Sequence, residues 1–132
     1  MKKVLFTVLA LAALVLVSCS DKKSTENNPF MSEYENEYGI PPFDKITYAD
    51  YEPAVAAGIE QQNAEIDSII KNTAEPNFEN TILALDNSGE ILSKVSGVLF
   101  ALSESDNTKE MHNLTETLMP KLTAQSDGMY LN

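Results

Sequence analysis

The sequence contains no arginine and no tryptophan, and its only cationic side chains are nine lysines set against 20 acidic residues. The formal net charge is −11 at pH 7. Without a guanidinium group the chain cannot clamp a phosphate with paired hydrogen bonds, and its negative charge repels a phosphodiester backbone. The composition therefore argues against nucleic acid as a partner.

Cysteine and histidine each occur once, at Cys19 and His112. A single cysteine forms no internal disulfide, and a single histidine cannot supply the histidine pair of an H-E-x-x-H zinc helix. The sequence also lacks a G-x-S-x-G motif and a glycine-rich phosphate loop. We therefore expect no catalytic residue, no metal site and no cofactor site in this chain.

The only long hydrophobic run lies at the start of the sequence. Two lysines precede an apolar run from Val4 to Val17, which is shorter than the about 20 residues that a membrane-spanning helix needs. Residues 1–18 are therefore typical of a signal peptide. The segment Leu16-Val17-Ser18-Cys19 resembles the lipobox of bacterial lipoproteins, which predicts cleavage before Cys19 and lipid attachment to its thiol. The alternative is a plain secretory signal in which Cys19 is incidental.

Lipidation would place the chain in the bacterial cell envelope, on the periplasmic side or at the outer membrane. Acyl chains hold a protein to a membrane without crossing it, so the expected membrane contact is the lipid anchor alone. Loss of residues 1–18 would leave seven lysines against 20 acidic residues. Residues 19–28 are mostly polar and show no hydrophobic period, which predicts a flexible tether.

A proline- and aromatic-rich arm follows between Pro29 and Asp44. Its large side chains are expected to pack onto the helical body as a strap, because exposing aromatic surface to water is unfavourable in free energy. These side chains belong to Phe30, Tyr34, Tyr38, Ile40 and Phe43. A peptide-recognition ligand is the alternative, although the arm has no P-x-x-P motif.

The remaining sequence shows a helical period, which predicts an all-α fold with about three antiparallel helices. The first is expected over residues 52–71, with Asp50 as its N-cap and Pro53 in its first turn. The second is expected to begin at the Asn77 cap and to run to about Ser103. Its apolar stripe comprises Phe78, Ile82, Leu85, Leu92, Leu99 and Leu102, joined by Ile91, Val95 and Val98. Two glycines inside it, Gly89 and Gly97, predict the close approach of a neighbour.

The third predicted helix carries an apolar stripe from Met111 to Leu122, with Asn107 as its cap and a kink at Pro120. His112 and Glu116 stand four residues apart on it, a spacing that suits an exposed pair and falls short of a zinc site without a third ligand. Four acidic residues are expected on the solvent-exposed faces of the helices, because nothing in their spacing indicates a carboxylate dyad. They are Asp67, Asp86, Glu90 and Glu104.

A series of short segments resembles the N-terminal region of the thimet oligopeptidase and peptidyl-dipeptidase family, with the bacterial dipeptidyl carboxypeptidase branch as the nearest match. The segments, in order, are Asn28-Pro29-Phe30, Pro41-Pro42-Phe43-Asp44-Lys45-Ile46, Tyr51-Glu52-Pro53-Ala54 and Asn77-Phe78-Glu79-Asn80-Thr81-Ile82, followed by Ala84-Leu85 and Ser88-Gly89. The resemblance covers residues 28–132.

The resemblance implies a helical wall or lid segment of a zinc metallopeptidase that releases C-terminal dipeptides from oligopeptides. Residues 29–132 would then be an incomplete N-terminal domain, truncated before the zinc-binding helix and requiring the missing C-terminal part of the same protein. This chain alone should be inactive, and zinc is expected only in the full-length enzyme. A different interpretation is a self-contained small helical lipoprotein that binds a protein or peptide through an apolar groove.

Overall fold

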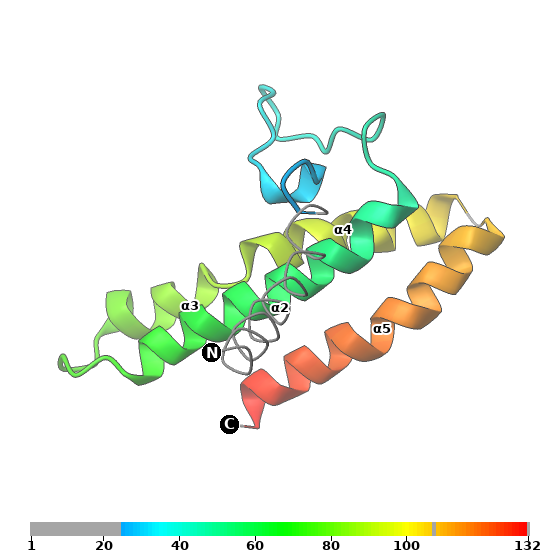
Figure 1. The fold of residues 1–132 in the computed structure, drawn as a ribbon. Coiled ribbons are helices and arrows are strands. Elements are labelled where there is room, and N and C mark those ends of the chain that lie inside the picture. The colour runs from blue at the N-terminus through cyan, green and yellow to red at the C-terminus, as the bar shows by residue number, and fades with distance from the viewer. Residues whose placement is uncertain (1–24, 107, 132) are drawn as a thin grey trace, which may run out of the picture.

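The computed structural model describes residues 25–106 and 108–131. Its long helices are α2 (Tyr48–Ile70), α4 (Glu90–Ser105) and α5 (Lys109–Tyr130), and its short helical elements are η1 (Pro29–Met31), η2 (Phe78–Leu83) and α3 (Ala84–Asp86). Helix α2 packs more closely against α4 than against α5 (Figure 1). No strand occurs in the described ranges, and the predicted all-α class is confirmed.

Helix α2 begins earlier than the sequence predicted. Thr47 is the N-cap, and its backbone amide and hydroxyl both donate to the carboxylate of Asp50, at 2.8 and 2.7 Å. The prediction of Asp50 as the N-cap is therefore wrong, because this residue closes a capping box from inside the first turn. Pro53 accordingly lies in the second turn, where a helix would use the missing amide to bond the carbonyl of Ala49.

The predicted second helix is wrong as a single element. Asn77 caps its start as predicted, since its side-chain oxygen accepts from the amide of Asn80 at 2.9 Å, but the first turns form the π-helix η2 and the short α3. The chain then turns at Gly89, whose φ of +76° lies in the left-handed region that favours glycine. Helix α4 starts directly after this turn.

Close approach between elements occurs at Gly89 and Gly58 and not at Gly97. A β-carbon at Gly89 would collide with the side chain of Gln62 on α2, whereas one at Gly97 would meet no atom within 4 Å. The predicted close approach of a neighbouring element is thus confirmed at Gly89, and the same prediction is wrong at Gly97. At Gly58, which was not selected from the sequence, a β-carbon would lie 3.0 Å from the backbone nitrogen of Leu92, so α2 and α4 approach each other closely there.

Helix α5 starts one residue after its cap, Thr108, whose hydroxyl accepts from the amide of Met111 at 3.1 Å. The predicted cap, Asn107, lies outside the described residues. Pro120 does not end the helix, which continues to Tyr130.

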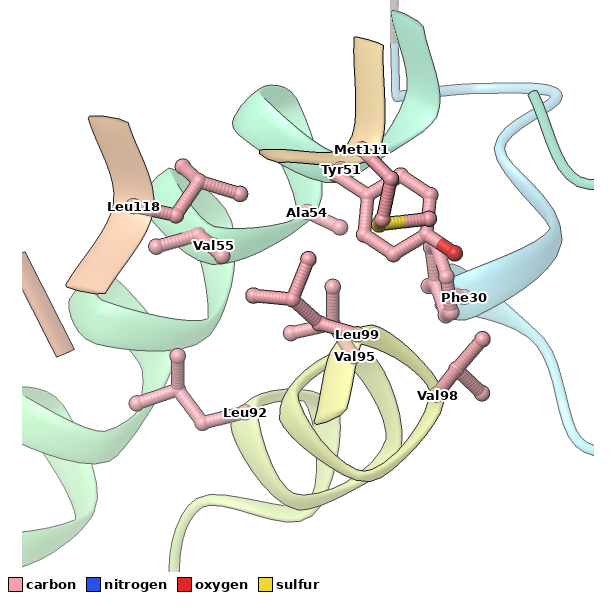
Figure 2. Packing of buried hydrophobic residues seen from close by; sticks show 10 residues of the cluster. All are labelled: Phe30, Tyr51, Ala54, Val55, Leu92, Val95, Val98, Leu99, Met111 and Leu118. Carbon is pink, nitrogen blue, oxygen red and sulfur yellow. The ribbon is translucent and has the colours of Figure 1, made fainter. Parts of the chain in front are cut away.

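The hydrophobic core lies between α4, the first half of α2 and the first half of α5, and Phe30 of the arm closes it at one end (Figure 2). Phe30 and Tyr51 pack with their ring centroids 5.1 Å apart. The buried apolar residues are Phe30, Tyr51, Ala54, Val55, Leu92, Val95, Val98, Leu99, Met111 and Leu118.

The arm is anchored at its start and projects from the body further along. Asn28, which the sequence analysis placed in the tether, is buried and donates to the carbonyl of Asp50 at 2.7 Å. Phe30 is buried as expected and Tyr34 is half-buried, but the last three aromatic or aliphatic side chains are exposed. The strap prediction is therefore wrong for Tyr38, Ile40 and Phe43.

The local cause of this exposure is a turn centred on Asn36. Its side-chain oxygen accepts from the amides of Tyr38 and Ile40, at 3.2 and 2.8 Å, and its amide group donates to the carbonyl of Ile40 at 2.7 Å. These bonds satisfy the backbone locally, so the loop holds its shape without packing its tip against the helices.

Candidate functional site

The described residues contain no catalytic constellation. His112 and Glu116 form a pair, with Nε2 and Oε1 3.4 Å apart, and both side chains are about two-thirds exposed, at 64% and 69%. Within residues 25–106 and 108–131 no group of three or more histidine, cysteine, aspartate or glutamate side chains could hold a metal ion. This part of the chain therefore does not fit a zinc ion, which needs at least three protein ligands.

The four acidic residues read as solvated faces are all exposed. Asp67 pairs with Lys71 and Glu90 pairs with Lys94, each at 2.6 Å and each across one helical turn. Asp86 and Glu104 are exposed as well. Exposed pairs of this kind contribute little to stability and indicate no acid–base chemistry.

Cys19, the predicted lipid-attachment residue, lies outside the described residues. Within the described ranges no helix combines the length and the apolar character that a membrane crossing requires.

In the described part of the chain, the hydroxyls of Tyr34 in the arm and Tyr51 in α2 are buried. Burial raises the pKa of Tyr51 to about 12, with smaller contributions from Tyr48, Asp50 and Tyr34. Burial also raises the pKa of Tyr34, and the ammonium group of Lys94, 5.4 Å from the Tyr34 ring centroid, opposes that shift. Neither hydroxyl has a hydrogen-bond partner among the described residues. Both lie where the arm meets the core, which indicates a structural position.

Large apolar side chains are exposed at the end of the molecule that is formed by the last turn of α2, by η2 and by α3. Between Gly58 and Gly89 no residue is buried. Five large side chains at this end are 40–62% exposed, and we name them the apolar tip. They are Ile70, Phe78, Ile82, Leu83 and Leu85.

Three of the tip residues were predicted to belong to a core stripe, and the tip was not predicted as an exposed surface. Phe78, Ile82 and Leu85 belong to the same apolar period as the buried Leu92 and Leu99. The signal that could have separated them is Gly89, because a left-handed turn breaks the helical register that joins the two halves.

Two open grooves also mark the surface. One, of about 1250 Å³, runs along α2 past Ala49, Pro53 and Ala56 and reaches Leu114 of α5. The other, of about 430 Å³, lies between α4 and α5 and is lined by Leu92, Phe100, Met119, Leu122 and Met129 among others. Apolar and small side chains line both grooves together with polar ones, which include Glu26, Glu52 and Glu60 in the first groove and Gln62 and Gln125 in the second.

No protein-family model matches the chain. Two curated proteins are similar to it, and both are named dipeptidyl carboxypeptidase. The protein of Salmonella typhimurium is 38% identical over 105 residues, which are 80% of this chain and 15% of that protein. The protein of Escherichia coli is 39% identical over 108 residues, which are 82% of this chain and 16% of that protein.

The chain thus spans about 15% of the length of the curated relatives that it matches. The ordered set of segments identified in the sequence and the identity across four-fifths of the chain point to the same group of proteins. Over four-fifths of its length this chain is therefore related to part of the dipeptidyl carboxypeptidases.

Proposed function

We propose that this chain is a helical wall segment of a zinc-dependent peptidyl-dipeptidase, which releases dipeptides from the C-terminus of oligopeptides. The segment contributes shape and packing surface, and it contributes no zinc ligand. The zinc-binding residues and the base of such an enzyme belong to the rest of the protein. By itself the chain is inactive, because the described residues bring no three ligands together.

The observation that supports this proposal most is the identity of 38–39% over four-fifths of the chain with two proteins that are about five times as long as this chain. The exposed apolar tip agrees with it. A segment taken from a larger fold is expected to expose the apolar surface that the rest of that fold covers.

A chimera tests the proposal directly. The matched 108 residues of the Escherichia coli dipeptidyl carboxypeptidase are replaced with the corresponding residues of this chain. We expect dipeptide release from a model oligopeptide within about tenfold of the parent's kcat/KM, since the active-site residues are unchanged. A second chimera that carries an unrelated helical segment of equal length is the control and should be inactive. A folded but inactive first chimera would contradict the proposal.

We further propose that the thiol of Cys19 carries a lipid that anchors the protein in the cell envelope. The test is expression of the chain in bacteria fed with radiolabelled palmitate. We expect label on the wild-type chain and none on Cys19→Ser, which should leave the membrane fraction because its anchor is missing. Equal membrane association of the unlabelled variant would refute the anchor.

The groove between α4 and α5 favours a second candidate, a self-contained lipoprotein that binds a peptide or protein at the envelope. The two candidates differ in their need for further sequence. A binding module should be a stable monomer without any other polypeptide, whereas a wall segment gains its stability from the rest of the enzyme. Zinc-dependent dipeptide release by this chain alone would contradict both candidates.

A further inference from the structure

We infer that the apolar tip is the surface through which this segment docks onto the remainder of the peptidase chain, against an apolar patch bordered by lysine and arginine. The inference rests on the proposed function and adds to it the contact that joins the wall segment to the rest of the enzyme.

The apolar tip has the composition of an internal surface. Phe78 and Ile82 are 62% and 55% exposed, and each would normally be buried against another element. Leu92 and Leu99, which follow them in the same apolar period, are buried by α2 and α5. Both pairs of residues are apolar, but only Leu92 and Leu99 are covered by other helices.

The charged side chains around the apolar tip are almost all acidic. Lys71 pairs with Asp67 at 2.6 Å, whereas Glu75, Glu79 and Asp86 are exposed and form no ion pair within residues 25–106 and 108–131. A surface that covers the tip therefore gains from positive charge around its apolar centre.

A symmetric contact with a second copy would bring like-charged acidic rims together, which is unfavourable. The relatives, in contrast, contain about 85% of their length beyond the part that this chain matches. Such a length of chain can supply both an apolar patch and basic side chains, so we assign the tip to that remainder.

The experiment measures the burial of the tip by thiol labelling. Cys19→Ser and Phe78→Cys are introduced together into the full 132-residue chain, and Phe78→Cys is also introduced into the Escherichia coli chimera, after its other cysteines are replaced with serine. We expect a maleimide to react at position 78 at least tenfold more slowly in the chimera than in the chain. Glu104→Cys, on an exposed part of α4, is the control and should react at similar rates in both.

Each outcome bears on one of the two proposals. An active chimera with slow labelling at position 78 supports the docking surface. An active chimera that is labelled at position 78 as fast as the chain overturns this inference and leaves the proposed function standing. A folded but inactive chimera overturns the proposed function and this inference together. A dimer of the chain that protects position 78 shows that a second copy covers the tip and also overturns the inference.

Discussion

At the scale of single residues, Gly89 decides how the chain turns between α3 and α4. Its positive φ and the adjacent Gln62 side chain leave no room for a β-carbon. We expect Gly89→Ala to lower the free energy of unfolding by about 1–2 kcal/mol, because alanine is strained in the left-handed region. Urea unfolding of residues 19–132 with Cys19→Ser, followed by circular dichroism, measures the effect.

Gly97 provides the matched control for this substitution. It lies inside α4, its φ is not positive, and a β-carbon there would meet no atom within 4 Å. Gly97→Ala should therefore raise the free energy of unfolding by about 0.5–1 kcal/mol through helix propensity. A loss of stability at Gly97, or none at Gly89, would contradict the assigned roles of the two glycines.

Ionisation of Tyr51 is expected to lower the free energy of unfolding at alkaline pH. Its pKa is raised from 10.0 to about 12 in the folded chain, chiefly by burial, so the folded state favours the protonated phenol. The contribution is complete below pH 10 and is lost as the pH rises from 10 towards 12. This loss reaches up to roughly 3 kcal/mol.

The variant Tyr51→Phe isolates this contribution. At pH 7 the change should alter the free energy of unfolding by less than about 1 kcal/mol, because the buried hydroxyl has no hydrogen-bond partner among the described residues. Between pH 9.5 and 11.5 the variant should lose less stability than the wild type. Parallel decline of the two proteins would show that Tyr51 does not titrate in this way.

At the scale of elements, α5 is attached by fewer buried residues than α4. Met111 and Leu118 are its only buried side chains in the described ranges, and both lie in its first half. Leu118→Ala should therefore cost about 2–5 kcal/mol and release the second half of the helix. Hydrogen exchange of the α5 amides is the measurement, and their protection should fall more than that of the α4 amides.

Met119 is the neighbouring control for α5. Its side chain is 37% exposed, so Met119→Ala should cost less than about 1 kcal/mol and leave the exchange of α5 nearly unchanged. Equal effects at positions 118 and 119 would mean that α5 is held by something other than this buried contact.

The elements also show what the sequence can and cannot predict. Local signals located the cap at Asn77, which acts through atoms a few residues away, but they misplaced the N-cap of α2, which is Thr47 and not Asp50. The period of Phe78, Ile82 and Leu85 identified an apolar face correctly, but it could not say whether anything covers that face. Whether a face is buried depends on residues that are distant in the sequence. Close contacts between helices depend on such residues as well, so the sequence did not indicate Gly58 and wrongly indicated Gly97.

At the scale of the whole molecule, the relationship to dipeptidyl carboxypeptidases was predictable from short ordered segments, whereas the exposed surface formed by the apolar tip was not. Segments such as Asn77-Phe78-Glu79-Asn80-Thr81-Ile82 are specific as strings of residues. The exposure of two of those residues follows only from the packing of α2, η2 and α4. A candidate site made of unreactive apolar side chains has no sequence motif to reveal it, unlike a zinc helix.

The distribution of the core leads to the last prediction, which concerns the stability of the isolated segment. The ten buried apolar residues are concentrated at one end, and the apolar tip at the other end is exposed. We expect residues 19–132 with Cys19→Ser to unfold with a free energy below about 5 kcal/mol, because small chains with an incomplete core are marginal. The exposed tip should also bind a fluorescent apolar dye.

The double variant Phe78→Ser/Ile82→Ser separates exposure from stability. Both side chains are more than half exposed, so the change should reduce dye binding markedly and shift the urea midpoint little. Leu99→Ala, in the buried core, should do the opposite by lowering the midpoint while the tip is unchanged. A free energy above about 8 kcal/mol with no dye binding would identify a complete small domain, and the segment would then not need the surface that we assign to the rest of the peptidase.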